Sequence, residues 1–219
     1  MTTDTKISPT IFIIIGATGD LTWRKLTPAI YNLWLDKWMP DNFEVIGVAP
    51  TKNSNVAFKK RLHEGVDQYS RKGKSKKSEW DNFAKCITYQ QGDFNASSTY
   101  SAIKKQIKDL EKKWKVAANC IFYLAVPPND FVDISKMLGS SGLTENKLKS
   151  RLVIEKPFGH DLESAMELNK LLHTIFDESQ IFRIDHYLGK EPCRTSWHSG
   201  SQILCMSQSG TAIILTTSR

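Results

Sequence analysis

Residues 11–21 read Ile-Phe-Ile-Ile-Ile-Gly-Ala-Thr-Gly-Asp-Leu, and this stretch decides the fold of the chain. Residues 11–15 are all β-branched or aromatic, which predicts a strand buried on both faces, as in a parallel sheet. Gly16 follows directly, and an apolar pattern with the period of a helix begins at about Asp20. A dinucleotide-binding loop lies between a strand and a helix in this way, because the helix N-terminus attracts phosphate.

Two glycines with the spacing G-x-x-G shape this loop. Gly16 would let the chain turn sharply, and Gly19 would let the backbone approach a pyrophosphate. The spacing is shorter than G-x-G-x-x-G, and a glycine after a strand often marks only a turn. The strand before the loop and the helix after it favour the coenzyme-binding role.

The rest of the chain alternates predicted strands with predicted helices. After the first helix, which we expect to end at Pro40, the pattern predicts strands at 43–48, 87–90, 120–126, 152–155 and 180–184. It predicts helices at 55–69, around Trp80, and at 100–115, 130–138 and 162–175. This alternation indicates an α/β fold with a Rossmann-type, doubly wound parallel sheet and right-handed crossovers, spanning residues 1–184.

The residues after the second strand bear on which dinucleotide is bound. They read Val48-Ala49-Pro50-Thr51-Lys52-Asn53 and contain no carboxylate. An acidic side chain here would bind the ribose hydroxyls of NAD and repel the 2′-phosphate of NADP. Thr51 and Lys52 could instead receive that phosphate, so the sequence favours NADP. The alternative is that Lys52 is an ordinary solvated loop residue.

A lysine follows the strand predicted at 152–155, in the motif Glu155-Lys156-Pro157-Phe158-Gly159. At the carboxyl end of a parallel strand, Lys156 would lie in the ligand crevice. Its ammonium group could contact sugar hydroxyls and the nicotinamide side of the coenzyme. The alternative is a lysine in an ordinary turn.

A second polar motif, residues 183–191, reads Arg-Ile-Asp-His-Tyr-Leu-Gly-Lys-Glu. His186, Tyr187 and Lys190 would form a phosphate cradle, although a capped turn with one salt bridge is the plainer alternative. Asp185 beside His186 suggests acid–base chemistry. Adjacent strand residues point to opposite faces, however, so these two side chains should not pair with each other.

Composition excludes several classes of protein. Apolar residues make up 40% and charged residues 24% of the chain, which is typical of a soluble globular protein. We expect it in the cytoplasm, because no secretory signal is recognised at its start. The early apolar run at 11–15 is too short to span a membrane, and the polar first ten residues do not form a secretory signal. Four cysteines show no C-x-x-C spacing and no neighbouring histidine cluster, so we expect no metal site.

The formal net charge is +7, and the positive charges gather at residues 71–77 and 104–115. A nucleic-acid surface would interleave such basic residues with stacking aromatic side chains. A solvated loop and the outer face of a helix explain the charge more simply. We therefore expect no nucleic-acid partner, and an attraction for anionic ligands fits equally well.

Three motifs in order, G-A-T-G-D-L, E-K-P-F-G and R-I-D-H-Y-L-G-K-E, resemble those of glucose-6-phosphate dehydrogenases. The resemblance runs from about Ile11 to Glu191 and includes the segment Tyr123–Pro128. It implies oxidation of glucose 6-phosphate to 6-phosphogluconolactone with NADP, in a homo-oligomer. The alternatives are a non-catalytic NADP-binding fragment, such as a pseudogene product, and another sugar oxidoreductase.

The resemblance also implies roles for individual residues. The coenzyme would be bound by Gly16, Thr18, Gly19, Asp20, Leu21, Lys52, Tyr123 and Lys156. The substrate would be bound by Lys25, Lys156, His186, Tyr187 and Lys190, and Asp185 would orient a catalytic histidine. Two positions depart from the family, which commonly has a basic residue at Trp23 and an arginine at Pro50 that clamps the 2′-phosphate.

The family pattern stops soon after Glu191. When codons for the family segment V-Q-D-I-L-A-L-R-F-A-N-P-L-Y-E-P-I-W-N-R-N-Y-I-D-H-V-Q are read one base later, they give Cys193 through Ser218. We therefore expect a single-base loss after Pro192, in the gene or in its recorded sequence. Residues 185–219 would then be a truncated start of a second, α+β domain, with 193–219 as a tail foreign to the family. The histidine base of Y-I-D-H would be absent, which predicts little or no activity for this chain.

Overall fold

A computed structural model describes residues 7–158, 161–184, 203–205 and 212–214. Its central element is a parallel sheet in the order β3-β2-β1-β4-β5-β6. The strands are β1 (Thr10–Ile15), β2 (Phe43–Ala49), β3 (Ile87–Gln91), β4 (Asn119–Leu124), β5 (Ser150–Glu155) and β6 (Ile181–Ile184). This order confirms the predicted doubly wound, Rossmann-type α/β sheet.

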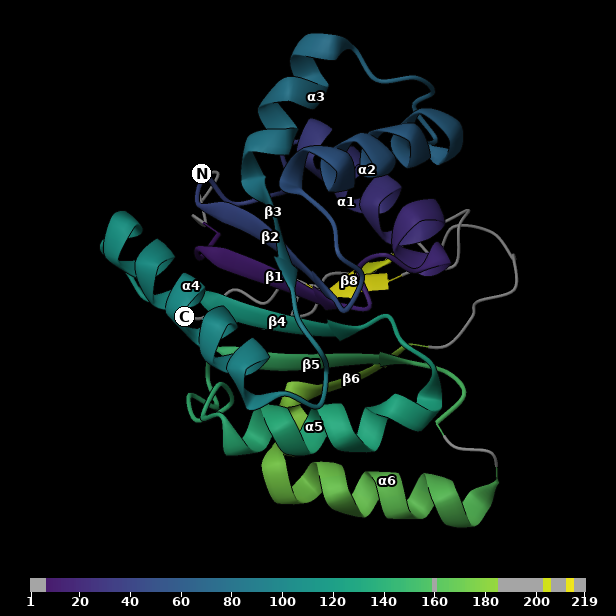
Figure 1. The fold of residues 1–219 in the computed structure, drawn as a ribbon, viewed down its shortest axis with the longest axis vertical. Helices are drawn as coiled ribbons and strands as arrows, with labels where there is room; N and C mark the ends of the chain where they lie inside the picture. Colours follow the sequence, from purple (N-terminus) through teal and green to yellow (C-terminus); the bar gives the residue numbers. More distant parts are fainter. Residues whose placement is uncertain (1–6, 159–160, 185–202, 206–211, 215–219) are drawn as a thin grey trace, which may run out of the picture.

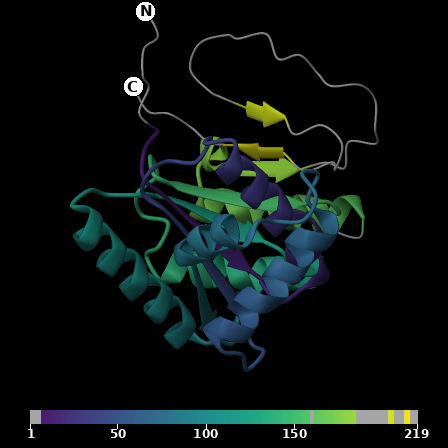
Figure 2. The same cartoon turned by 90° about the horizontal axis from the view of Figure 1, so that it is seen from above.

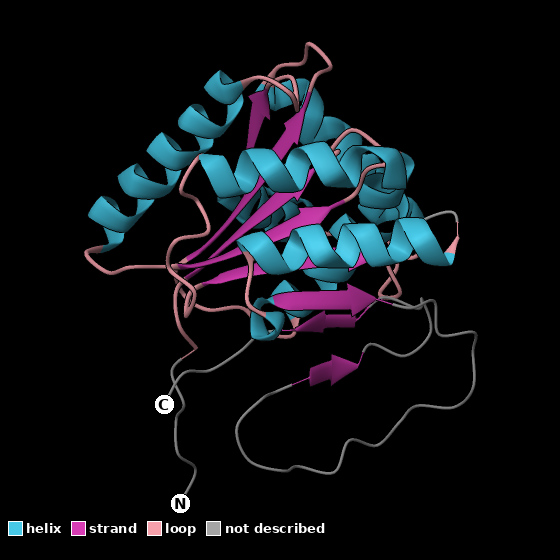
Figure 3. Cartoon of the chain, turned by 90° about the horizontal axis from the view of Figure 1, so that it is seen from below, coloured by secondary structure: helices cyan, strands magenta, loops and turns pink. Residues whose placement is uncertain are grey.

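Three helices cover each face of the sheet (Figure 1). On one face lie α1 (Thr27–Leu35), α2 (Asn55–Tyr69) and α3 (Lys77–Phe83), seen from their own side in Figure 2. On the other lie α4 (Ser97–Trp114), α5 (Phe131–Ser140) and α6 (Leu162–Ile175), which Figure 3 shows from their side. A π-helical turn, η1 (Thr22–Leu26), precedes α1, and short 3-10 turns occupy Ala84–Cys86, Pro128–Asp130 and Glu178–Gln180.

β1 shows why the sheet is buried on both sides. Every residue of this strand is buried. Phe12 and Ile14 pack against the α1–α3 layer, whereas Ile11, Ile13 and Ile15 pack against the α4–α6 layer. The alternation of side chains along a strand therefore divides one apolar run between two cores.

The first helix is shorter than the sequence predicted. It ends at Leu35 and not at Pro40, because Lys37 adopts a left-handed conformation with φ 59°. The N–H of Trp38 then donates to the carbonyl of Leu33 (3.0 Å), which caps the helix. Trp38, which lies beyond the end of the helix, is 44% exposed.

The last two described segments form a small antiparallel pair, β7 (Ile203–Cys205) with β8 (Ala212–Ile214). Both lie within the tail at 193–219 that the sequence analysis set apart from the family pattern. Across all the described segments, no helix combines the length and the apolar character needed to cross a membrane.

Candidate functional site

The candidate site lies where β1 and β4 end side by side. The chain crosses from β3 at one edge of the sheet to β4 next to β1, and such a reversal leaves a crevice beyond the carboxyl ends of the strands. The register aligns Ile15 with Val48 on one side and with Leu124 on the other. The residues that follow these three positions therefore face the same crevice.

The backbone of the glycine loop is tightly fitted at its start. Gly16 has φ +95°, a left-handed conformation that favours glycine. A Cβ atom at this position would stand 2.3 Å from the carbonyl oxygen of Ala125, just beyond β4. At Gly19 a Cβ would come within 3.1 Å of the Gly16 carbonyl oxygen. At both glycines of the loop, neighbouring backbone therefore leaves little space for a side chain.

The loop leaves backbone donors available for an anion. The N–H groups of Gly16 and Ala17 donate to Val48 (2.9 and 3.0 Å), and that of Gly19 donates to Gly16 (2.9 Å). By contrast, the N–H groups of Thr18, Asp20 and Leu21 make no backbone hydrogen bond within the described part of the chain. Free donors at the start of a helix are the arrangement that binds a pyrophosphate, so the loop fits a dinucleotide.

The loop after β2 meets the glycine loop. The hydroxyl oxygens of Thr18 and Thr51 lie 3.3 Å apart, although the two residues are 33 positions apart in the sequence. Lys52 is exposed beside Thr51. The structure thus brings together the two segments from which the sequence predicted pyrophosphate and 2′-phosphate contacts.

A residue that the sequence analysis did not single out, Tyr89 of β3, supports this second loop. Its hydroxyl lies between the carbonyl oxygens of Ala49 (3.1 Å) and Thr51, which share its one proton. Its backbone N–H donates to the side chain of Asn55 (2.7 Å) at the start of α2. Burial raises the pKa of Tyr89 further above its ordinary value of 10.0. No local sequence signal marks this role, because the contacts join residues 38 and 40 positions apart.

The π-helical turn carries Lys25, a predicted substrate contact, on its exposed surface. Asp20 and Arg24 form an exposed ion pair at 3.1 Å on the same helical start. The Arg24 guanidinium also lies over the rings of Trp23 (5.8 Å) and Tyr69 (5.5 Å). The opening of this helix is therefore held against α2 by aromatic and cation–π contacts.

Trp23, where the family commonly has a basic residue, packs on a glycine of α2. A Cβ on Gly65 would stand 2.6 Å from Cδ1 of Trp23 and 2.4 Å from its carbonyl oxygen. The Trp23 and Tyr69 rings meet edge to face with centroids 5.1 Å apart. The absence of a side chain at Gly65 thus makes room for the bulky residue at position 23.

Tyr123, a predicted coenzyme contact, is buried on the α1–α3 side of the sheet. Its hydroxyl donates a hydrogen bond to Oε1 of Glu155, and burial is the largest cause of its raised pKa, followed by the Glu155 charge. Lys156 follows β5 with an exposed side chain, and its backbone N–H donates to Ile184 (3.2 Å). The lysine therefore stands at the carboxyl edge of the sheet, as the sequence predicted.

Four predicted site residues, Asp185, His186, Tyr187 and Lys190, lie outside the described residues. Their roles stay predictions. No cluster of histidine, cysteine, aspartate or glutamate suited to a metal ion occurs in the segments that the structure describes.

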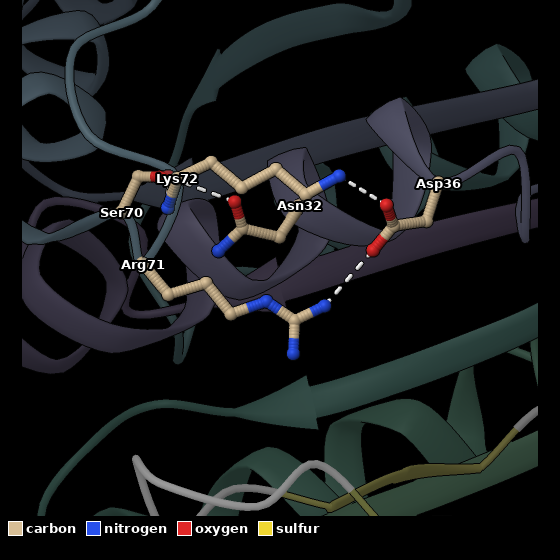
Figure 4. Close-up of polar contacts among 5 residues, drawn as sticks. All are labelled: Asn32, Asp36, Ser70, Arg71 and Lys72. Atoms are coloured by element: carbon tan, nitrogen blue, oxygen red, sulfur yellow. Dashed lines mark hydrogen bonds and ion pairs between the residues drawn. The ribbon is translucent and has the colours of Figure 1, made fainter.

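The basic segment 71–77 is tied to the end of α1 (Figure 4). Asp36 accepts hydrogen bonds from Arg71 (2.9 Å) and Lys72, and the bond from Lys72 is the first cause of its lowered pKa. The hydroxyl of Ser70 donates to the buried Asn32 side chain (2.8 Å). Two positive charges of this segment are therefore paired with one carboxylate at the end of α1.

Comparison with known proteins identifies the family. The family described as glucose-6-phosphate dehydrogenase, NAD binding domain, matches residues 13–194. Glucose-6-phosphate 1-dehydrogenase of Chlamydia pneumoniae is 37% identical over 188 residues, which cover 84% of this chain and 36% of that protein. The chain thus spans little more than a third of the length of such relatives.

Two solved structures show the same fold. A glucose-6-phosphate dehydrogenase in complex with its substrate glucose 6-phosphate superposes with a TM-score of 0.76 at 34% identity, covering 85% of this chain and 38% of that one. Glucose-6-phosphate 1-dehydrogenase from Mycobacterium avium gives 0.70 at 30% identity, covering 82% and 36%. By sequence and by structure, this chain belongs to the glucose-6-phosphate dehydrogenase family and contains its NAD-binding domain.

Proposed function

We propose that this chain supplies the coenzyme-binding part of an enzyme that oxidises glucose 6-phosphate with NADP. The observation that carries the proposal is the glycine loop at the end of β1, which has free N–H donors and no room for a Cβ at Gly16. Family membership supports the substrate and the reaction, and the whole enzyme would be a homo-oligomer. Sedimentation of the purified protein would test the oligomer.

In this proposal the coenzyme lies across the crevice. The loop Gly16–Leu21 and the start of its helix hold the pyrophosphate, because backbone donors and the helix dipole favour negative charge. Thr18, Thr51 and Lys52 receive the 2′-phosphate, and Lys52 supplies the positive charge that the family arginine would give at Pro50. Tyr123 packs within the sheet beneath the crevice and supports the coenzyme site through its hydrogen bond to Glu155. The bound coenzyme supplies the nicotinamide ring that accepts a hydride from C1 of the sugar.

The proposed substrate contacts lie at the same edge of the sheet. Lys156 holds the sugar beside the nicotinamide, and Lys25 approaches from the π-helical turn. His186, Tyr187 and Lys190 hold the phosphate of glucose 6-phosphate. In a full-length family enzyme, Asp185 would orient the histidine base that takes the proton from the anomeric hydroxyl while the hydride leaves C1, giving the lactone. Because the expected base is absent from this 219-residue chain, we expect the chain to bind its ligands with little or no turnover.

Calorimetric titration of the 219-residue chain tests this assignment without requiring turnover. We expect NADP to bind, and glucose 6-phosphate to bind more tightly than glucose because the phosphate has its own contacts. Lys156→Ala should weaken sugar phosphate binding about tenfold, which corresponds to about 1.4 kcal/mol. Lys105→Ala, on the exposed face of α4, is the matched control and should change neither titration.

The two halves of the proposal can fail separately. A chain that binds NADP but shows no preference for glucose 6-phosphate over glucose would contradict the substrate assignment. A folded chain that binds no dinucleotide would contradict the whole proposal.

A further inference from the structure

The segment Pro50–Ser54, which joins β2 to α2, is held at both ends by one residue. The hydroxyl of Tyr89 fixes the carbonyls of Ala49 and Thr51 at the start of the segment. The backbone N–H of Tyr89 binds the Asn55 side chain at its end. Gly92 N–H and the Gln91 side chain also donate to the carbonyls of Ala49 (3.0 Å) and Pro50 (3.4 Å), whereas the carbonyl of Thr51 is bound by the Tyr89 hydroxyl.

The hydroxyl group of Tyr89 is not needed to hold its own ring. That ring packs on Phe58 of α2 with centroids 4.7 Å apart, and Tyr89 is only 7% exposed. Phe58 in turn lies over Gly47 of β2, where a Cβ would come within 2.5 Å of the Phe58 ring. Burial and packing on Phe58 thus hold the ring, and the hydroxyl has the carbonyls of Ala49 and Thr51 as its partners.

In the proposed coenzyme site, Thr51 would contact the 2′-phosphate through a neutral hydroxyl, and so would depend on this support. A charged side chain attracts a phosphate over several ångströms, whereas a hydroxyl must lie within hydrogen-bond distance and at a suitable angle. Thr51 meets Thr18 across 3.3 Å, so a shift of the loop would separate the two hydroxyls. The position before Thr51 is Pro50, which has neither a charged group nor a backbone N–H to compensate.

We propose that Tyr89 is a positioning residue for coenzyme selectivity, because it fixes the Thr51 hydroxyl beside Thr18, where the two read the 2′-phosphate of the dinucleotide. This inference rests on the proposed function. It adds that Tyr89 gives the site its selectivity for NADP over NAD, although the family arginine is missing at Pro50. A dinucleotide without a 2′-phosphate offers this hydroxyl pair only a neutral ribose hydroxyl. Loss of the Tyr89 hydroxyl therefore lowers the affinity for NADP and leaves that for NAD largely unchanged.

Calorimetric titration of the whole chain with NADP and with NAD tests the inference. Tyr89→Phe keeps the ring on Phe58 and removes only the hydroxyl. We expect the ratio of the two affinities to fall about five- to tenfold, as for the loss of one hydrogen bond. Thr51→Val, which removes the second hydroxyl while keeping its shape, should lower the ratio similarly, and the double variant should lower it little further.

The matched control is Tyr100→Phe. Tyr100 is also a buried tyrosine that donates to a backbone carbonyl, that of Phe94 (2.7 Å), but it lies on the opposite face of the sheet. Tyr100→Phe should lower the melting temperature without moving the ratio of affinities.

The outcomes separate this inference from the proposed function. If the wild-type chain binds dinucleotide but Tyr89→Phe and Thr51→Val keep its ratio, or lower both affinities equally, the positioning role is wrong and the coenzyme site stands. If the wild-type chain binds neither dinucleotide, the inference and the proposed function are both overturned.

Discussion

The hydroxyl of Tyr123 donates a hydrogen bond to the carboxylate of Glu155, joining the carboxyl ends of β4 and β5 one residue before Lys156. The donor is buried and its acceptor is charged, so this bond belongs to the stronger class. Tyr123→Phe should lower the free energy of unfolding by about 1.5–3 kcal/mol, measured by urea denaturation. Glu155→Gln provides the second corner of a double-mutant cycle. Equal costs of Tyr123→Phe in the wild-type and Glu155→Gln backgrounds would show that the pair is not coupled.

Gly16→Ala should abolish dinucleotide binding and destabilise the fold. The new Cβ would meet the Ala125 carbonyl oxygen at 2.3 Å, and the left-handed backbone at this position adds strain. We expect a loss of about 2–4 kcal/mol in thermal or urea unfolding, as for overpacking combined with backbone strain. Gly73→Ala is a matched control, because Gly73 also has positive φ (+77°) but no atom within 4 Å of a built Cβ. Gly73→Ala should cost about 1 kcal/mol and leave binding intact.

The stability of the protein should fall as the pH rises from about 4.5 to about 7, because of Glu44 on β2. Burial raises the pKa of this carboxyl group from 4.5 to about 7, against the opposing effects of Lys113, Lys59 and Thr88. The folded chain therefore holds the proton more tightly than the unfolded chain, and the free energy of unfolding decreases between about pH 4.5 and pH 7. After discounting for partial solvent screening, we expect a decrease of about 1–2 kcal/mol.

Urea denaturation at about pH 5 and pH 8 measures this contribution. Glu44→Gln should remove it, whereas Glu64→Gln, on the exposed side of α2, should keep the wild-type pH dependence. An unchanged pH dependence in Glu44→Gln would assign the effect to another group.

Asp36→Asn should loosen the attachment of the basic segment 71–77 to α1. The cost should be at most about 1 kcal/mol, because the pair is partly exposed to solvent, and it should shrink at high salt. The lowered pKa means that this contribution is present above the ordinary pKa of 3.8 and is lost as the pH falls below it. Limited proteolysis after Arg71 or Lys72 should be faster in the variant than in Asp41→Asn, a control on an exposed aspartate. Equal cleavage rates would show that Asp36 does not anchor the segment.

The sheet was predictable because its central strands contain local apolar runs. Residues 11–15 are buried on both faces, so their composition alone marks a central strand, and α6 was predicted with its observed bounds from its helical period. Gly16 also carries a local signal, since a left-handed turn at the end of a strand favours glycine. The fold class and the position of the coenzyme loop therefore follow from short-range pattern.

Contacts between distant segments were not predictable. The Tyr89 hydroxyl meets carbonyls about 40 positions away, and nothing in the sequence around Tyr89 distinguishes it from another buried aromatic residue. The family resemblance predicted that Tyr123 lies near the crevice. It could not predict the hydrogen bond to Glu155, because the register of β4 against β5 sets that partner. The end of the first helix depended on the left-handed turn at Lys37, a conformation that a lysine seldom adopts.

The π-helical turn between Leu21 and Thr27 makes the start of the first helix tolerant of a change in length. Here the N–H of Thr27 donates to the carbonyl of Thr22, five positions back. In an α-helix the acceptor lies four positions back, so this turn contains one extra residue. A homologue lacking one residue between Leu21 and Thr27 would close the turn as a regular α-helix. Such a deletion would leave the glycine loop before it and the buried face of α1 after it in their present places, whereas Lys25 and its neighbours would rotate to new directions.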